Sequence, residues 1–276
     1  MDFFTHEILT PTLARIKDVT GVYAYLAVGT ERAALVDAGT GIGDLAAYVR
    51  GLTAKPLTLL VTHGHMDHAG GASRFGEAFL AEEDRALAAA HGTRAMIEGY
   101  ARTILRGAAD GIGDADYPPA APVDWKPWRH GDVLDLGGVS VEAVRVPGHT
   151  QGMTCALFRE DRMLLYGDAC NPFVFLFGEE SSTVAEYRTS LVALRAYGDR
   201  YDRALMSHGA ELFDADLLES CLAVCDDILA GRTDDVPFPF MGRLNPIAKA
   251  VTTEGGWFRR ADGGLGNIVY DRARIR

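Results

Sequence analysis

Residues 63–68 read His-Gly-His-Met-Asp-His, so three imidazoles and a carboxylate fall within six positions of a chain that holds eight histidines. Chance seldom produces such a cluster, and three histidines around an aspartate would be costly to bury without a cation. Both ligand types suit zinc, and imidazole also suits iron. The stretch therefore predicts most of the ligands of two neighbouring metal ions.

The flanking sequence predicts that this cluster lies at the end of a strand. Leu57–Thr62 is a short apolar run typical of a buried strand, and Ala69-Gly70-Gly71 follows with the backbone freedom of a strand-to-helix turn. Folds of the α/β class commonly carry their chemistry at the carboxyl ends of strands. We therefore expect the cluster to face a functional site.

Two metal sites need more than four ligands, and three further candidates follow along the chain. Each follows a hydrophobic run and touches a glycine, as expected of side chains on loops at one edge of a sheet. They are His149 after Val139–Val146, Asp168 after Met163–Tyr166 and His208 after Arg203–Ser207. The other histidines, His6, His91 and His130, lack this context and are interpreted as surface or packing residues.

The order His-x-His-x-Asp-His, Gly-His-Thr, Gly-Asp and a late histidine resembles the metallo-β-lactamase-fold superfamily over roughly residues 8–230. The resemblance implies an α/β protein built as a four-layer αββα sandwich. It also implies one metal held by His63, His65 and His149, a second held by Asp67, His68 and His208, and Asp168 as the bridge. Asp37 matches the family's aspartate that orients a ligand histidine, with a turn-capping role as the alternative.

By the same resemblance, the chain is a hydrolase that uses a metal-bridged hydroxide to cleave an ester, thioester or lactone of a small molecule. Asp67 and Asp168 are the expected catalytic residues, and two divalent ions the expected cofactor, zinc first with iron or manganese as alternatives. Met153 stands where glyoxalase II-like members commonly have histidine. Asp168 is followed by Ala169-Cys170-Asn171-Pro172, without the tyrosine that lactonases of the family often carry shortly after this aspartate.

Three alternatives remain open at this stage. A mononuclear iron sulfur dioxygenase would use His63, His149 and Asp168. A phosphodiesterase or β-lactamase-type amide hydrolase would use the full set. A non-catalytic binding module is the least favoured, because all seven ligand positions are intact.

The amino-acid composition limits the kinds of binding partner and the cellular location that we expect for the chain. The 276 residues suffice for one domain with a small appendage, and the net charge of −11 argues against nucleic acid as a partner. We find no signal-peptide pattern at the start, no membrane-length apolar run and no disulfide pattern among the four cysteines. We expect a cytoplasmic protein that acts on a small molecule, with no membrane contact. Cys170, Cys221 and Cys225 are interpreted as structural.

Periodicity predicts how the chain is organised. Val22–Val28 and Ala33–Val36 should pair as strands, and helices are expected over Asp44–Leu52, over Thr183–Tyr197 with a capping box of Thr183 and Glu186, and over 217–229. We expect a domain over 1–235 and an extension over 236–276 that packs on it.

Two regions exceed what a metal core needs. An insertion over about 82–130, helical over Glu82–Gly107 and a loop over Ala108–Trp128, is a candidate lid. Its aromatic residues, Tyr100, Tyr117, Trp125 and Trp128, are candidates for a substrate wall, although packing is favoured. The tail 241–276 holds seven Lys and Arg against three Asp and Glu. It could hold an anionic substrate, but a solvated surface or a subunit contact, as in a homodimer, is favoured.

Overall fold

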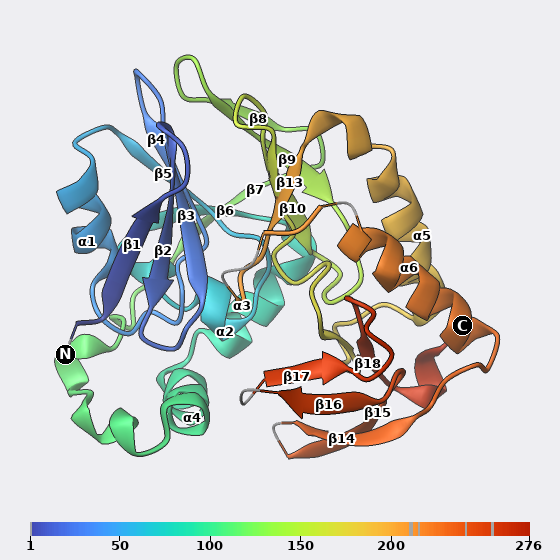
Figure 1. Ribbon diagram of the computed structural model, residues 1–276. Helices are drawn as coiled ribbons and strands as arrows, with labels where there is room; N and C mark the ends of the chain where they lie inside the picture. The colour runs from blue at the N-terminus through green and yellow to red at the C-terminus, as the bar shows by residue number, and fades with distance from the viewer. Residues whose placement is uncertain (1, 210–211, 215, 241, 255–256) are drawn as a thin grey trace.

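The structure is a computed structural model that describes residues 2–209, 212–214, 216–240, 242–254 and 257–276. Two sheets lie face to face between helices (Figure 1). The first sheet has the order β1 (Phe4–Ile8), β2 (Leu13–Asp18), β3 (Tyr23–Val28), β4 (Ala33–Val36), β5 (Leu57–Leu60), β6 (Glu77–Leu80), β7 (Asp124–Pro127). The second has the order β13 (Arg203–Leu205), β11 (Met163–Leu165), β10 (Thr154–Phe158), β9 (Ser140–Arg145), β8 (Val133–Asp135).

Alternation along the strands explains the layers. In β4, Ala34 and Val36 belong to the core between the two sheets, whereas Ala33 and Leu35 belong to the core beneath α1 (Leu45–Leu52). Because successive side chains of a strand point to opposite faces, a strand buried on both faces is apolar throughout. β10 behaves in the same way, with alternate residues in the inter-sheet core and in the core beneath the helices. The αββα sandwich predicted from the sequence is confirmed.

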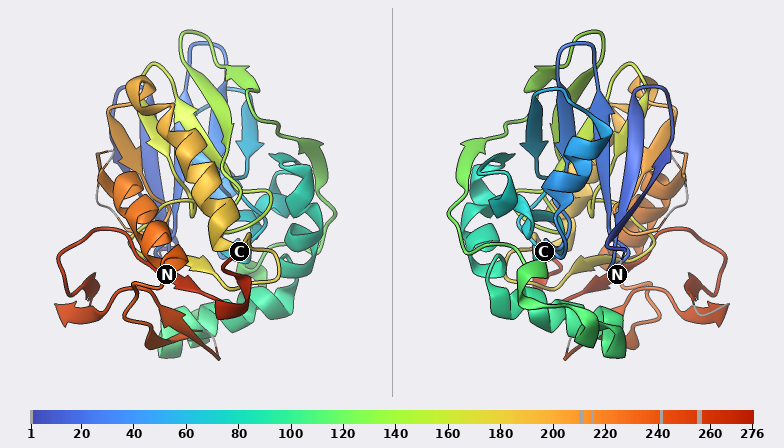
Figure 2. Two further views of the ribbon diagram at one scale, coloured as in Figure 1. Left: turned by 90° about the vertical axis from the view of Figure 1, so that its right-hand side faces the viewer. Right: turned by 90° about the vertical axis from the view of Figure 1, so that its left-hand side faces the viewer.

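Helices α5 (Val184–Arg195) and α6 (Asp216–Leu229) cover the outer face of the second sheet (Figures 1 and 2). The predicted capping box is present: the Thr183 hydroxyl accepts from the Glu186 amide at 3.2 Å, and the Glu186 carboxylate accepts from the Thr183 amide at 2.9 Å. Cys221 and Cys225 are buried in this helical layer, as predicted, and Cys170 lies in the same core.

The insertion differs from the prediction in two ways. The expected helix over Glu82–Gly107 is wrong as one element, because Gly92 and Thr93 interrupt it between α3 (Arg85–His91) and α4 (Arg94–Leu105). The hydroxyl of Thr93 accepts from the Met96 amide at 3.4 Å and so caps the new helix. Short 3₁₀ turns follow at Arg106–Gly111 and Asp114–Asp116.

The expected loop over Ala108–Trp128 is wrong at its end. Asp124–Pro127 forms β7, which pairs in parallel with β6 at the edge of the first sheet. A strand that ends in proline is tolerated at the edge of a sheet, because the outer side of an edge strand has no neighbouring strand to hydrogen-bond. The run is too short for its alternation to predict a strand.

The C-terminal residues 236–276 add strands beneath the sandwich (Figure 1). Their sheet has the order β12 (Val174–Leu176), β18 (Ile268–Tyr270), β15 (Arg243–Ile247), β14 (Val236–Phe240). A hairpin of β16 (Val251–Glu254) and β17 (Trp257–Arg260) stands apart. Because β12 belongs to the body and pairs in parallel with β18, the extension is joined to the body by a shared sheet.

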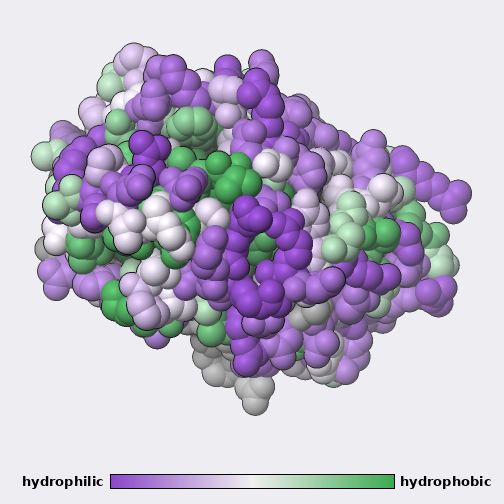
Figure 3. All heavy atoms as spheres, turned by 90° about the horizontal axis from the view of Figure 1, so that it is seen from above, coloured by the Kyte–Doolittle hydropathy of each residue, from purple (hydrophilic) through white to green (hydrophobic). Residues whose placement is uncertain are grey.

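The surface offers two further observations. The end of the sandwich turned upward in Figure 1 is covered mainly by hydrophilic side chains, with apolar residues in small patches (Figure 3). Within the described residues, every helix is too short or too polar to cross a bilayer.

Candidate metal centre

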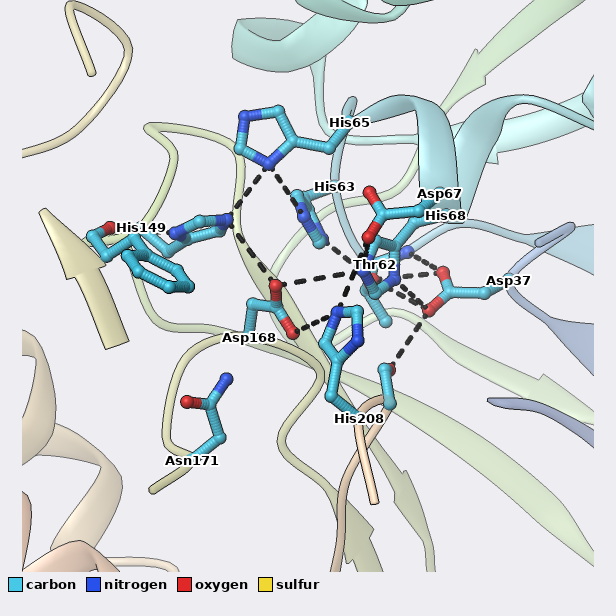
Figure 4. A network of polar contacts seen from close by, with 12 residues as sticks. Asp37, Thr62, His63, His65, Asp67, His68, His149, Asp168, Asn171 and His208 are labelled. Atoms are coloured by element: carbon cyan, nitrogen blue, oxygen red, sulfur yellow. Dashed lines mark hydrogen bonds and ion pairs between the residues drawn. The ribbon is translucent and has the colours of Figure 1, made fainter. Parts of the chain in front are cut away.

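The structure brings together all seven predicted ligands, although they are spread over 146 positions from His63 to His208. They come from loops that follow strands and from one short helix, as shown in Figure 4. These are His63 and His65 after β5, Asp67 and His68 on the short helix α2 (Met66–Ala69), His149 between β9 and β10, Asp168 after β11 and His208 after β13.

His63, His65 and His149 form the first group, here named site 1. Nδ1 of His65 lies 3.1 Å from Nε2 of His63 and 2.9 Å from Nε2 of His149. Nitrogens bound tetrahedrally to zinc at 2.0–2.1 Å would lie about 3.3 Å from one another. The spacing therefore fits three nitrogens that share one cation.

Asp67, His68 and His208 form the second group, here named site 2. Oδ2 of Asp67 lies 3.4 Å from Nε2 of His208 and 3.7 Å from Nε2 of His68. These spacings are also those of ligands around one small divalent ion.

Asp168 lies between the two groups. Its Oδ2 is 3.5 Å from Nε2 of His149 and 3.7 Å from Nε2 of His68, and its Oδ1 is 3.4 Å from Nε2 of His208. One carboxylate thus reaches ligands of both sites, which is the place that the resemblance assigned to the bridge.

Two buried atoms in this centre test whether cations fit. Nε2 of His68 and Oδ1 of Asp168 are inaccessible to solvent and make no hydrogen bond, although Oδ1 lies within ion-pair distance of His208. A buried polar atom without a partner is costly, and the cost disappears where the atom coordinates a cation. The donor set of imidazole nitrogens and carboxylate oxygens is one that zinc and related ions accept. The residues present therefore fit a pair of divalent cations.

Four ligand histidines are held through the ring nitrogen that faces away from the centre. Nδ1 of His68 lies 2.9 Å from Oδ2 of Asp37, and Nδ1 of His149 lies 2.8 Å from the Phe175 carbonyl oxygen. The corresponding partners are the Thr62 hydroxyl for His63, at 3.1 Å, and the Glu180 carboxylate for His65, at 3.4 Å. When the inner nitrogen binds metal, the outer one carries the proton and donates, so these contacts fix both tautomer and ring orientation.

Asp37 is fully buried and has the positive φ of 69° that glycine usually adopts. Besides His68, its carboxylate accepts from the Thr62 amide at 2.7 Å and the Thr62 hydroxyl at 2.9 Å. The contact to a ligand histidine is the one that the resemblance implied. Asp37 therefore links the end of β4 to the start of the ligand cluster.

The charges of the centre shift the pKa values of its histidines in opposite directions. Burial and the neighbouring His65 lower the pKa of His149 to about 4. Burial also acts to lower the pKa of His68, but the carboxylates of Asp67 and Asp37 outweigh it and raise that pKa to about 10. Without metal, His149 of site 1 is therefore a neutral imidazole at neutral pH, whereas His68 of site 2 is an imidazolium.

Asp84 ties together the two loops that form site 1. Its Oδ2 accepts from the Gly64 amide at 2.9 Å and the Thr150 hydroxyl at 2.6 Å, and its Oδ1 accepts from the Gly152 amide at 2.6 Å. A Cβ on Gly152 would lie 2.3 Å from Cγ of Asp84, so glycine is required for this approach. The sequence offered no signal for Asp84, because a single acidic residue after a strand is usually a turn or a cap.

His91, interpreted as a surface or packing residue, packs beside site 1, a position that the sequence did not predict. Its ring stacks on the ring of His65 with centroids 5.0 Å apart. The helix α3 carries it there from the insertion, a placement that requires the tertiary fold. His6, by contrast, bonds the Tyr48 hydroxyl at 2.9 Å on the surface, and His130 is exposed.

Of the four aromatic candidates in the insertion, Tyr100 contacts the centre. Its hydroxyl donates to Oδ2 of Asp67 at 3.1 Å. Burial first, and then the charge of Asp67, raise the pKa of Tyr100 well above its usual value, so the phenol stays protonated. Tyr117 packs with Tyr100 in a small apolar cluster, whereas Trp125 and Trp128 pack onto the sheets. Packing is therefore the role of these last three.

The match to a family model covers residues 18–208 and is described as the metallo-beta-lactamase superfamily. The chain belongs to this superfamily and is one of its metal-binding hydrolases.

Individual relatives narrow the comparison. The chain is 30% identical over 188 residues to an acyl-coenzyme A thioesterase MBLAC2 of Gallus gallus, covering 64% of this chain and 67% of that protein. The bovine and human proteins of the same name are matched over 56% of their length. The chain is 25% identical over 169 residues to the hydroxyacylglutathione hydrolase GloC of Haemophilus influenzae, covering 59% of this chain and 76% of that protein.

Among solved structures, a metallo-beta-lactamase from Pontibacter korlensis has a TM-score of 0.57 and 16% identity, covering 80% of this chain and 97% of that one. At that identity the likeness supports the fold alone.

Proposed function

We propose that the protein is a binuclear metallo-hydrolase that cleaves a thioester of a small molecule. The observation that carries the proposal is the convergence of seven ligand side chains in one place. Two of their buried atoms, Nε2 of His68 and Oδ1 of Asp168, make no hydrogen bond. Two divalent cations, with zinc favoured, would lower the pKa of a water that they share and polarise the substrate carbonyl.

The side chains of the protein supply position and proton handling. Asp168 reaches ligands of both sites and so fixes their separation. Asp67 lies beside His68 and His208 and is itself held by the Tyr100 hydroxyl, so its carboxylate is placed to orient the attacking water. We assign the catalytic roles to Asp67 and Asp168, and Asp37 acts through His68 as a positioning residue.

The names of the relatives favour a thioester among the three candidate bonds. One is an acyl-coenzyme A thioesterase and another a hydroxyacylglutathione hydrolase. Met153, which stands in place of the glyoxalase II histidine, is fully buried in the core beneath the helices. Met153 is therefore not a contact for glutathione.

The test combines metal analysis with turnover of butanoyl-coenzyme A. We expect two divalent ions per chain, and a fall in kcat/KM of at least about 100-fold in His63→Ala and Asp168→Ala. His130→Ala, an exposed histidine outside the centre, is the matched control and should retain activity. Full activity in either ligand variant would defeat the mechanism. A single iron with oxygen consumption on persulfides would favour the dioxygenase instead.

A further inference from the structure

We propose that six phenylalanines beside site 1 form a binding surface for the apolar acyl chain of the substrate, so that the enzyme prefers longer acyl thioesters. This inference rests on the proposed function and assigns the part of the substrate that the metal centre does not hold. The phenylalanine cluster consists of Phe173, Phe175, Phe177, Phe238, Phe240 and Phe258. It contains half of the 12 phenylalanines of the chain.

Two strands of the C-terminal sheet build the cluster by alternation. In and around β12, Val174 and Leu176 point into the core beneath the helices, so Phe173, Phe175 and Phe177 face the other way and remain partly exposed. β14 presents Phe238 and Phe240 to the same cluster.

Ring contacts make the surface continuous. Phe175 stacks on Phe240 with centroids 4.3 Å apart. Phe238 lies 5.6 Å from Phe258, whose side chain is 51% exposed. The cluster therefore runs from β12 across β14 to the hairpin that carries Phe258.

The backbone that carries the cluster contacts the metal centre. The carbonyl oxygen of Phe175 accepts the hydrogen bond of the ligand His149 at 2.8 Å, so the backbone of the cluster holds a residue of site 1. At its start, the Phe173 amide donates to Oδ1 of Asn171, three positions after Asp168, at 2.8 Å. In the proposed arrangement, an acyl chain attached to a carbonyl at the metals extends from site 1 over these rings.

The chemistry of the surface selects the occupant. Its rings offer apolar contact and no hydrogen bond, which suits a hydrocarbon chain. At its edge, the Arg243 guanidinium lies 5.7 Å from the Phe177 ring and donates to the Phe177 carbonyl at 3.2 Å. Among the described residues Arg243 has no carboxylate partner, so its charge is available to an anionic thioester such as an acyl-coenzyme A.

The experiment measures kcat/KM for straight-chain acyl-coenzyme A esters from butanoyl to hexadecanoyl with the metal-loaded enzyme. If each added methylene is buried, kcat/KM should rise by about three- to fourfold per methylene until the surface is filled. Phe240→Ala and Phe258→Ala should lower the ratio of the hexadecanoyl to the butanoyl value by about tenfold. Leu244→Ala, which removes a 69% exposed apolar side chain of the same sheet outside the cluster, is the control and should keep the wild-type profile.

The outcomes separate this inference from the proposed function. If no thioester of any length is hydrolysed, the proposed function fails. If thioesters are hydrolysed with a flat profile, or the phenylalanine variants keep the wild-type profile, the acyl-chain surface is overturned while the hydrolase stands. If these variants change the oligomeric state without changing the profile, the surface is a contact between copies of the chain, which also overturns it. Circular dichroism of each variant checks the fold.

Discussion

Oε1 of Glu180 lies 3.4 Å from Nε2 of His65, on the side of the imidazole opposite the nitrogen that faces His63 and His149. The hydrogen bond with His65 lowers the pKa of Glu180 to about 2 despite partial burial, so this carboxylate is charged at neutral pH. His91 stacks on the same ring. His65 is thus oriented by a negative charge at one edge and an aromatic face.

Removing that charge should weaken metal binding at site 1. We expect Glu180→Gln to lower metal affinity by about tenfold, because a carboxylate partner raises the basicity of a ligand histidine and fixes its ring. Competition with a chelator measures the affinity. Glu179→Gln removes the same charge from an exposed neighbour and should bind metal like the wild type. If Glu180→Gln and Glu179→Gln bound metal with equal affinity, Glu180 would have no role in metal binding at site 1.

Asp84 should matter for both stability and turnover. In Asp84→Asn the amide NH₂ must face either the Gly152 N–H or the donors of Gly64 and Thr150, because all three partners donate. We expect the free energy of unfolding to fall by about 3 kcal/mol, and Tm by roughly 6–12 °C.

The activity of Asp84→Asn should fall as well, since the loops of His65 and His149 lose their common partner. Thermal unfolding of metal-loaded protein and kcat/KM measure the two effects. Glu82→Gln changes an exposed residue of the 3₁₀ turn Glu82–Asp84, which also holds Asp84, and is the control for the loss of charge. An unchanged Tm in Asp84→Asn would show that the bridge contributes nothing.

Glu180, Asp84 and His91 differ from the seven ligands in how well the sequence could predict them. The ligands follow apolar runs and stand next to glycines or one another, so local pattern and family resemblance identify them. The layers were predictable from the same family resemblance, and the apolar run Ala33–Val36 predicted the strand β4. Short, atypical strands such as β7 were not.

Glu180, Asp84 and His91 lack any local pattern. Glu180 lies 115 positions from His65 and Asp84 lies 66 positions from Thr150. Their roles depend on segments far apart in the sequence that meet in the folded chain, and a single carboxylate outside a motif has many other uses. The phenylalanine cluster is similar, since β12 and β14 meet through β18 and β15 of the extension.

The two sites should differ in how metal binding depends on pH. The pKa of His149 is lowered to about 4, so at neutral pH this residue of site 1 has no proton to release. The pKa of His68 is raised to about 10, so a cation entering site 2 must displace its proton. Affinity for the second metal equivalent should therefore fall as the pH falls below 10, by up to about tenfold per unit, whereas protonation of His149 weakens binding of the first equivalent only as the pH approaches about 4.

Calorimetric titration of metal-free protein with zinc at pH 6 and at pH 8.5, in buffers of different ionisation enthalpy, tests this. We expect one tight equivalent at the lower pH, two at the higher, and proton release with the second. Two equivalents with the same pH dependence would contradict the assignment of imidazolium to site 2.

Tyr100 should affect turnover more than metal content. Its hydroxyl donates to Asp67, while its ring packs with Ile97 and Met66 in the small cluster of the insertion. Tyr100→Phe keeps the ring and removes the hydrogen bond to a charged oxygen, so Asp67 loses one restraint on the orientation of its carboxylate. We expect kcat to fall by about tenfold, with two metals still bound and Tm little changed. The control is Tyr117→Phe, from the same cluster, whose hydroxyl has no hydrogen-bond partner among the described residues. Metal loss in Tyr100→Phe would assign the tyrosine to the assembly of site 2, and wild-type kcat would show that Asp67 needs no help from the insertion.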